Sequence, residues 1–285
     1  TASMFRVDIN DELKLIQVKT NEESKEEILA EGYFIFDEPG HAVLVIFEYI
    51  NILPEDYCKL GQLLSTFILH LGQHFKSLIC LRLPVTFDNR IDFNKLEFKS
   101  NISNFMAVKN DNLKHYADRN IESQQDQYVL ITDKQLILGF AESLYNILKQ
   151  EAYWCATLTL EEMKNRINSS AHIAMILDKT YNQPCGYGRL FLLKTNTQLF
   201  GYMSDVAINS SHQSKGLGSI LINHFVGTFL KKYSELENIN GTLCLLCADK
   251  GNGAISAPKI YRKAGFEYLN DLGNRIAIFS NRDFR

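Results

Sequence analysis

One segment in the second half of the chain constrains the fold more than any other. Residues 206–218 pass from an apolar strand through a polar turn into a long helix, and Gly216 and Gly218 stand at the first turn of that helix. Glycines at this place let the backbone approach an anion, and the unpaired amides and dipole of a helix start favour negative charge. The glycine spacing differs from those of the dinucleotide-binding and nucleoside-triphosphate-binding loops. The segment therefore predicts a strand, turn and helix that together bind a pyrophosphate.

The chain around this segment alternates strand and helix patterns, and a similar order of patterns occurs twice. The first series predicts strands at 31–36 and 41–50, a helix at 57–75, a strand at 78–83, a short helix around 93–96 and a strand at 105–108. The second series predicts a strand at 128–131, helices at 135–150 and 159–168, strands at 171–177, 186–193 and 199–208, a helix at 216–233, a strand at 243–248, a short helix at 256–265 and strands at 266–269 and 275–279. This order is typical of a mixed α/β fold with an antiparallel run and helical crossovers.

The length of 285 residues favours two domains. Residues 110–127 are polar and without clear periodicity, which predicts a linker. We therefore expect an N-terminal domain at 4–120 and a C-terminal domain at 121–285. Residues 1–3, before Met4, are interpreted as a cloning remnant.

Composition and charge exclude several classes of function. The net charge of −3 leaves no basic surplus for nucleic acid or an anionic membrane. The longest apolar run, at 42–47, is far shorter than the ~20 residues that span a bilayer, and the N-terminus has no signal pattern. We expect a cytoplasmic protein with no nucleic-acid or membrane partner. The six cysteines are scattered, which predicts free thiols and no metal site, since Cys244 and Cys247 lie in a predicted strand.

Two motifs in the second half resemble those of a known family. The first is Gln213-Ser214-Lys215-Gly216-Leu217-Gly218, which resembles the Q/R-x-x-G-x-G/A signature that GNAT-superfamily enzymes use to hold the pyrophosphate of coenzyme A. The strand at 206–208 before it looks like the central strand of these enzymes. The second is 261–266, Tyr-Arg-Lys-Ala-Gly-Phe, which resembles their downstream Tyr-x-x-x-Gly-Phe element. The resemblance extends from about 128 to 279 and implies a GNAT-like fold for this half.

The resemblance implies an N-acetyltransferase that moves the acetyl group of acetyl-CoA directly to a primary amine through a tetrahedral intermediate. It assigns Tyr261 as the acid that protonates the leaving thiolate, and the competing interpretation is a core tyrosine. Ser210 stands where many relatives have proline, and Asn252 is displaced from the position of the family's asparagine. The residues expected to bind the cofactor are Val206, Ala207, Ile208, Gln213, Ser214, Lys215, Gly216, Leu217, Gly218, Ser219, Asn252 and Tyr261.

The reaction needs few further groups. A primary amine with a pKa of ~10.4 must lose a proton before it attacks, and Asp205 is the carboxylate nearest in sequence to the expected reacting centre. A bulge in the central strand near 206–208 could direct a backbone amide at the oxyanion. Strand alternation would place Asp205 on the face opposite Ser204 and Val206. Asp205 is therefore a candidate general base whose alternative is a structural role, with Ser204 and Tyr202 as lesser candidates for the base.

The first half predicts a degenerate copy of the second. Residues 54–61 stand between strand and helix as 210–217 do, with Tyr57 in place of Gln213 and Leu60 in place of Gly216. Residues 93–98 parallel 261–266, with Phe93 lacking the hydroxyl and Glu97 replacing the glycine. We expect a GNAT-like domain that has lost its cofactor site and helps to shape the acceptor cleft; the rival interpretation is an unrelated α/β domain.

Two other functions remain open at this level. One is a non-catalytic acetyl-CoA-binding regulator, and the other is a structural protein that keeps only the fold. The acceptor is expected to be an amine, with a small molecule favoured over a protein, and no pattern selects it further. The sequence gives no indication of the oligomeric state.

Overall fold

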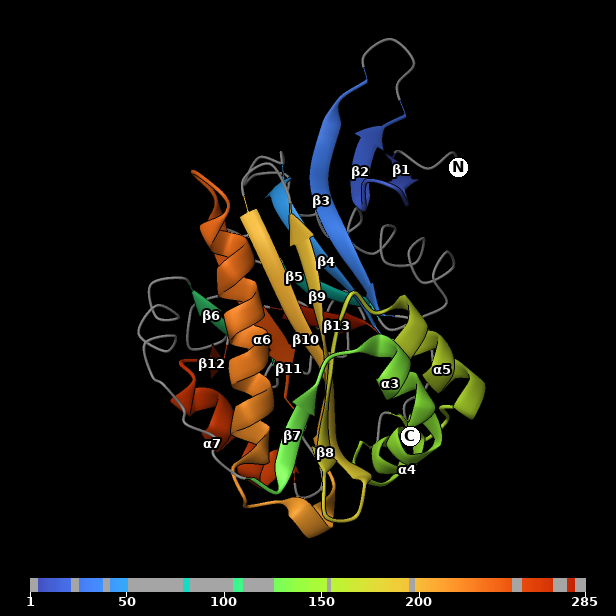
Figure 1. The fold of residues 1–285 in the computed structure, drawn as a ribbon. Coiled ribbons are helices and arrows are strands. Elements are labelled where there is room, and N and C mark those ends of the chain that lie inside the picture. Colours follow the sequence, from blue (N-terminus) through green and yellow to red (C-terminus); the bar gives the residue numbers. More distant parts are fainter. Residues whose placement is uncertain are drawn as a thin grey trace. The chain divides into compact units, whose positions relative to one another are not determined.

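The computed structural model describes residues 5–21, 26–37, 42–50, 79–82, 105–109, 126–152, 155–194, 198–247, 253–268 and 276–279 (Figure 1). The chain divides into two compact units. One comprises Thr1–Ser103 together with Leu269–Arg285, and the other comprises Asn104–Tyr268. The helices predicted at 57–75 and around 93–96 lie outside the described residues.

The second unit is built on a seven-stranded mixed sheet with the order β12-β6-β11-β10-β9-β8-β7. β10 runs parallel to β11, and the other neighbouring pairs are antiparallel. The parallel pair is joined by a helical crossover through α6 (Leu217–Ser234). The strands are β6 Phe105–Lys109, β7 Tyr128–Ile131, β8 His172–Asp178, β9 Gln183–Lys194, β10 Gln198–Ile208, β11 Asn240–Leu246 and β12 Glu267–Tyr268.

Helices cover both faces of this sheet, and each face has its own apolar core. The helices α6 and α7 (Gly253–Lys263) pack on one face, where Leu221, Phe225 and Phe229 are buried. The helices α3 (Lys134–Gly139), α4 (Ala141–Glu151) and α5 (Leu160–Ser169) pack on the other face, where Leu144, Leu148 and Met163 are buried. Figure 1 shows α6 and the α3–α5 group on opposite sides of β8–β10. The sheet is therefore the middle layer of three.

Two predictions about these helices had different outcomes. The single helix predicted at 135–150 is wrong, because the chain breaks at Phe140, whose amide donates to the carbonyls of Ile137 and Leu138 instead of continuing α3. The capping box predicted at the start of α5 is confirmed: the Glu162 amide donates to Thr159 Oγ1 at 3.2 Å, and the Thr159 amide donates to Glu162 Oε2 at 2.9 Å. These bonds satisfy amides that a helix start leaves unpaired.

The first unit has a six-stranded sheet with the order β1-β2-β3-β4-β5-β13. Only β4 and β5 are parallel. This order and these directions match β7-β8-β9-β10-β11-β6 of the second unit strand for strand. The two sheets differ at one connection, because β1 and β2 are joined by 11–14 where the second unit has α3–α5 between β7 and β8. The strands are β1 Phe5–Asn10, β2 Leu15–Thr20, β3 Ile28–Asp37, β4 Ala42–Ile50, β5 Ile79–Arg82 and β13 Ile276–Phe279.

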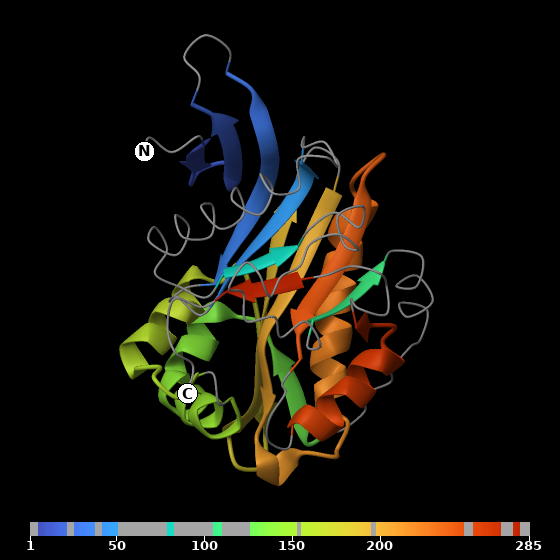
Figure 2. The ribbon, with the colours of Figure 1, turned by 180° about the vertical axis from the view of Figure 1, so that it is seen from behind.

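Each unit takes one strand from the other half of the chain. β6 lies between β11 and β12 in the sheet of the second unit, although it precedes the linker predicted at 110–127. β13 pairs with β5 in the sheet of the first unit, although it lies near the C-terminus (Figure 2). The division expected between 120 and 121 cuts the chain once, whereas the compact units exchange a strand. The exchange gives β5 and β11 a hydrogen-bonding partner on their second edge.

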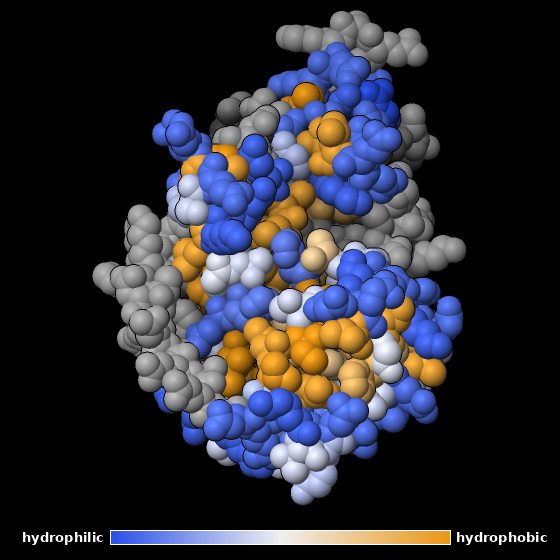
Figure 3. All heavy atoms as spheres, viewed as in Figure 1, coloured by the Kyte–Doolittle hydropathy of each residue, from blue (hydrophilic) through white to orange (hydrophobic). Residues whose placement is uncertain are grey.

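The surface of the second unit has both polar and apolar areas. On the face shown in Figure 3, apolar side chains gather over β7 and the neighbouring helices, and the exposed apolar residues of these elements include Val129 and Leu136. Within the described segments, no helix combines the length and apolar character needed to cross a membrane.

Candidate active site

The central feature of the site is the edge where β10 leaves β11. The parallel pairing runs from Gln198 opposite Asn240 to Met203 opposite Leu245. Beyond Met203, β10 continues to Ile208 and stays paired with β9. A bulge lies between Ser204 and Ala207, which confirms the bulge predicted in this strand. The backbone of 204–208 therefore lies beyond the ladder with β11 and can offer amides to a ligand on that edge.

The polar turn after β10 leads to an open helix start. Ser214 and Gly216 have left-handed backbone angles, with φ of 63° and 79°, and Gly216 is the N-cap of α6. No side chain caps α6, and its first turn contains no acidic residue. Ser214, Lys215 and Gly216 are exposed. The helix start therefore has no side-chain cap and lies at the surface, an arrangement that favours an anion.

The turn is held in place by side chains that the sequence analysis did not identify. Glu151, at the end of α4, accepts a hydrogen bond from the Ser210 amide at 2.9 Å and one from Gln213 Nε2 at 3.3 Å. Gln213 Nε2 also donates to the Ile208 carbonyl at 3.0 Å. The Gln213 side chain therefore holds the turn together, and a ligand would be bound by the backbone of the turn instead of by this side chain. No local pattern could have identified Glu151, because it is 62 residues from Gln213.

A second anchor joins the turn to the sheet. His212 Nε2 lies 3.1 Å from Asp178 Oδ2, and Lys215 Nζ donates to the Tyr128 hydroxyl at 3.5 Å. Desolvation opposes ionisation of Asp178, but hydrogen bonds from His212, the Thr180 amide and Gln127 outweigh it, so the pKa of Asp178 lies below its ordinary value. Asp178 thus stays a carboxylate, the form that binds His212 most strongly.

Tyr261 lies on α7 in the core that includes α6. Its side chain is buried, and its ring lies 5.9 Å from that of Phe266. Burial raises the pKa of the Tyr261 hydroxyl well above its usual value, and nearby Cys247 raises it further. The hydroxyl therefore remains protonated at neutral pH, as a proton donor must. This position is compatible with both interpretations of Tyr261: a tyrosine of the apolar core and the acid that protonates the leaving thiolate.

The other predicted cofactor residues are divided between core and surface. Leu217 and Ala207 are buried, while Val206, Ile208, Gly218 and Ser219 are half-buried. A side chain at Gly218 would place its Cβ 3.3 Å from Ile260 Cδ1, so the glycine keeps α6 close to α7. Asn252 lies outside the described residues.

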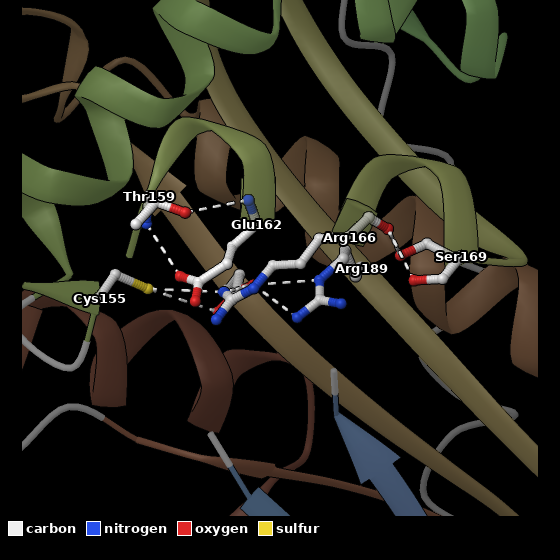
Figure 4. Close-up of polar contacts among 8 residues, drawn as sticks. Cys155, Thr159, Glu162, Arg166, Ser169 and Arg189 are labelled. Carbon is white, nitrogen blue, oxygen red and sulfur yellow. Dashed lines mark hydrogen bonds and ion pairs between the residues drawn. The ribbon is translucent and has the colours of Figure 1, made fainter. Parts of the chain in front are cut away.

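Asp205 lies at the bulge, where two arginines and the Cys155 thiol surround its carboxylate (Figure 4 labels these three partners); Cys155 Sγ donates to Oδ1 at 3.9 Å. Asp205 Oδ2 accepts hydrogen bonds from Arg166 Nη1 at 2.7 Å and from Arg189 at 2.6 Å (Nη2) and 3.0 Å (Nε). All three side chains are at most 1% exposed. The expectation that Asp205 faces away from Ser204 is wrong, because Ser204 is opposite Arg189 in the register and Asp205 contacts Arg189. The bulge, with a φ of 55° at Asp205, turns both side chains to the α3–α5 face.

A comparison of the sequence with protein families identifies the class of domain to which part of the second unit is similar. Residues 169–268 match the profile of a family described as an acetyltransferase (GNAT) domain. Residues 169–268 of the second unit therefore correspond to a GNAT acetyltransferase domain, and acyl transfer is the class of activity that this family supports. No curated protein sequence matches the chain.

Solved structures share the fold over most of the chain. A protein from Drosophila covers 93% of this chain and 78% of its own, with 10% identity and a TM-score of 0.52. A tandem GNAT protein from the clavulanic acid biosynthesis pathway covers 93% of this chain and 81% of its own, with 10% identity and a TM-score of 0.51. At this identity the likeness concerns the fold alone. Together with the matching strand order of the two sheets, it shows a mixed α/β fold of two tandem GNAT-like domains.

Proposed function

We propose that the second unit binds acetyl-CoA and transfers its acetyl group to a primary amine. The observation that carries the proposal is the uncapped, exposed start of α6. It follows the turn after β10, the strand that separates from β11 beyond Met203. A helix start without a side-chain cap, and with no acidic residue in its first turn, favours a pyrophosphate. The left-handed Gly216 allows the backbone to approach the ligand closely.

Different parts of the site would have different roles in acetyl transfer. When bound, acetyl-CoA supplies a thioester carbonyl. Backbone amides at 206–208, beyond the ladder with β11, would donate to the carbonyl oxygen as its negative charge develops. The turn at 213–218 would hold the phosphates, with Lys215 and Ser219 at its rim. Positioning of the amine and the thioester can lower the barrier by roughly 7–11 kcal/mol, which makes geometry the main contribution.

Tyr261→Phe is expected to lower turnover about a hundredfold while leaving acetyl-CoA affinity within about threefold, because only the proton donor to the leaving thiolate is lost. Steady-state kinetics with an amine acceptor and calorimetry with acetyl-CoA would measure the two effects. Tyr233→Phe is the matched control, since the Tyr233 hydroxyl donates to the Ile239 carbonyl in the same unit. Full turnover of Tyr261→Phe would remove the acid role.

We propose that the first unit, the N-terminal GNAT-like domain, holds no acetyl-CoA. Its sheet repeats the strand order of the second unit but has residues 11–14 in place of α3–α5. The substitutions expected at 57, 60, 93 and 97 lie outside the described residues. Calorimetry of the full chain should give one acetyl-CoA per chain; two equivalents would show that the first unit keeps a site.

A second candidate function is an acetyl-CoA-binding regulator without turnover. The observation that favours it is the enclosure of Asp205 by Arg166 and Arg189, which occupies the carboxylate predicted as a base. Thermal-shift titration with acetyl-CoA and a screen of small primary amines for CoA release would separate the two functions. Stabilisation by acetyl-CoA with no release from any amine would favour the regulator.

We further propose a reducing, cytoplasmic environment and a small-molecule amine as acceptor. The four cysteines within the described segments, Cys155, Cys185, Cys244 and Cys247, are buried free thiols, which supports the first point. Burial raises the pKa of the Cys185 thiol to about 12, so this thiol is unreactive at neutral pH.

A further inference from the structure

The bulge of β10 is held by two cations that come from different elements. Arg189 lies on β9 directly opposite Ser204, and its guanidinium donates twice to Asp205 Oδ2. Arg166 comes from the last turn of α5 and donates to the same oxygen. Figure 4 shows both guanidinium groups converging from the helix and the strand. The carboxylate thus links α5, β9 and β10 at one point.

The backbone at Asp205 needs such support. Its φ of 55° lies in the left-handed region, which residues other than glycine rarely adopt unless the surrounding structure holds them there. Hydrogen bonds between ions are shorter and stronger than neutral ones, and here they are fully shielded from water, with side-chain exposures of 0% for Arg166 and 1% for Asp205. The ion pairs are therefore placed to fix the one residue of the bulge whose conformation is unfavourable.

The position of Arg166 is itself fixed. α5 begins with the capping box at Thr159, and the Arg166 carbonyl accepts a hydrogen bond from Ser170 Oγ at 2.6 Å. α5 packs on α3 and α4 through the buried Met163 and Ile167. The backbone that carries Arg166 is therefore fixed, so the bulge is tied to a helix that is itself anchored at both ends.

We propose that Arg166, Arg189 and Asp205 form a positioning triad that sets the direction of the bulge amides, and that Asp205 acts through this geometry and not as the proton acceptor. The proposal rests on the acetyl transfer proposed above for the role of the bulge amides. It gives a positioning role to Arg166 and Arg189, which belong to no motif identified in the sequence. It also separates Asp205 from the chemical step, because the carboxylate oxygen nearest the arginines is already committed to three donors.

The first test uses hydrogen exchange, which needs no activity. Arg166→Met in the full chain is expected to increase amide exchange of the segment 203–208 about tenfold, because the bulge loses one of its two supports. Lys134→Met is the matched control, since Lys134 Nζ donates to the Asn168 carbonyl and ties α3 to α5 away from the bulge. Equal exchange of 203–208 in Arg166→Met and the unaltered chain would overturn the triad.

The second test separates positioning from proton transfer. Asp205→Asn should lower kcat about a hundredfold, as a misplaced group can, with acetyl-CoA affinity kept within about threefold. Arg166→Met keeps the Asp205 carboxylate and removes one of its donors. If Asp205 acts through position, Arg166→Met should also lower kcat at least about tenfold, with the same pH dependence as the unaltered chain. An Arg166→Met variant that kept the kcat of the unaltered chain, while Asp205→Asn lost it, would overturn the proposal in favour of a base. If the unaltered chain bound no acetyl-CoA, the proposed function would fail, while the exchange result would still decide the triad.

Discussion

A fragment of residues 121–268 is expected not to fold, whereas a fragment of residues 104–268 is expected to fold and to bind acetyl-CoA. The shorter fragment lacks β6, which pairs with β11 on one edge and β12 on the other. Its loss exposes the ladder edge of β11 and leaves β12 without a neighbour in the sheet. A hydrogen bond exchanged for bonds to water costs about 0.5–1.5 kcal/mol, so the loss of the bonds along both edges of β6 is comparable with a domain stability of about 5–15 kcal/mol. Circular dichroism and gel filtration would compare the fragments.

A pair of proline variants tests the same strand exchange in the full chain. Ala107 lies on β6 opposite both Cys244 and Glu267, and a proline there removes a donor from the middle of a sheet. Ala107→Pro should destabilise the second unit by about 3 kcal/mol or more and abolish acetyl-CoA binding. Ala277→Pro is the control, because Ala277 lies on β13 in the first unit. Acetyl-CoA affinity that survives Ala107→Pro but not Ala277→Pro would contradict the exchange.

Gly216→Val is expected to weaken acetyl-CoA binding at least about a hundredfold while the fold remains intact. No atom lies within 4 Å of a Cβ built at this position, so the protein itself has room for a side chain. The obstacle is the backbone, because a φ of 79° costs an L-residue roughly 1–2 kcal/mol and a β-branched one more. A valine would therefore either distort the start of α6 or fill the space that the phosphates require. Calorimetry would measure the affinity.

Gly227→Val is the matched control for this variant. Gly227 lies on an exposed part of α6, also has no atom within 4 Å of a built Cβ, and has no left-handed φ. It should keep the acetyl-CoA affinity of the unaltered chain. Equal affinities for Gly216→Val and Gly227→Val would show that the pyrophosphate lies elsewhere.

Local patterns predicted most of the second unit because they depend on neighbours in the sequence. The helix period of 217–234, the capping box at Thr159 and the glycines before α6 all describe contacts within a few residues. The first two strands of the first unit were not predicted, although 5–10 alternates apolar and polar residues and the signal was present. The break at Phe140 was missed because apolar spacing continues across it.

The sequence by itself therefore determined most of the strands and helices of the second unit, the turn and helix start at 213–218 that we propose to bind phosphate, and the resemblance of this half to GNAT domains. The tertiary structure alone decided which strands share a sheet, so that β6 and β13 are exchanged, and which face Asp205 occupies. The physical reason is that strand partners and bulges are set by hydrogen bonds between residues far apart in the chain, and a single extra residue in a strand reverses the alternation of side chains. Arg166 and Glu151 reach the site from helices 39 and 62 residues away from their partners, and only the packing of those helices on the sheet brings the charges together.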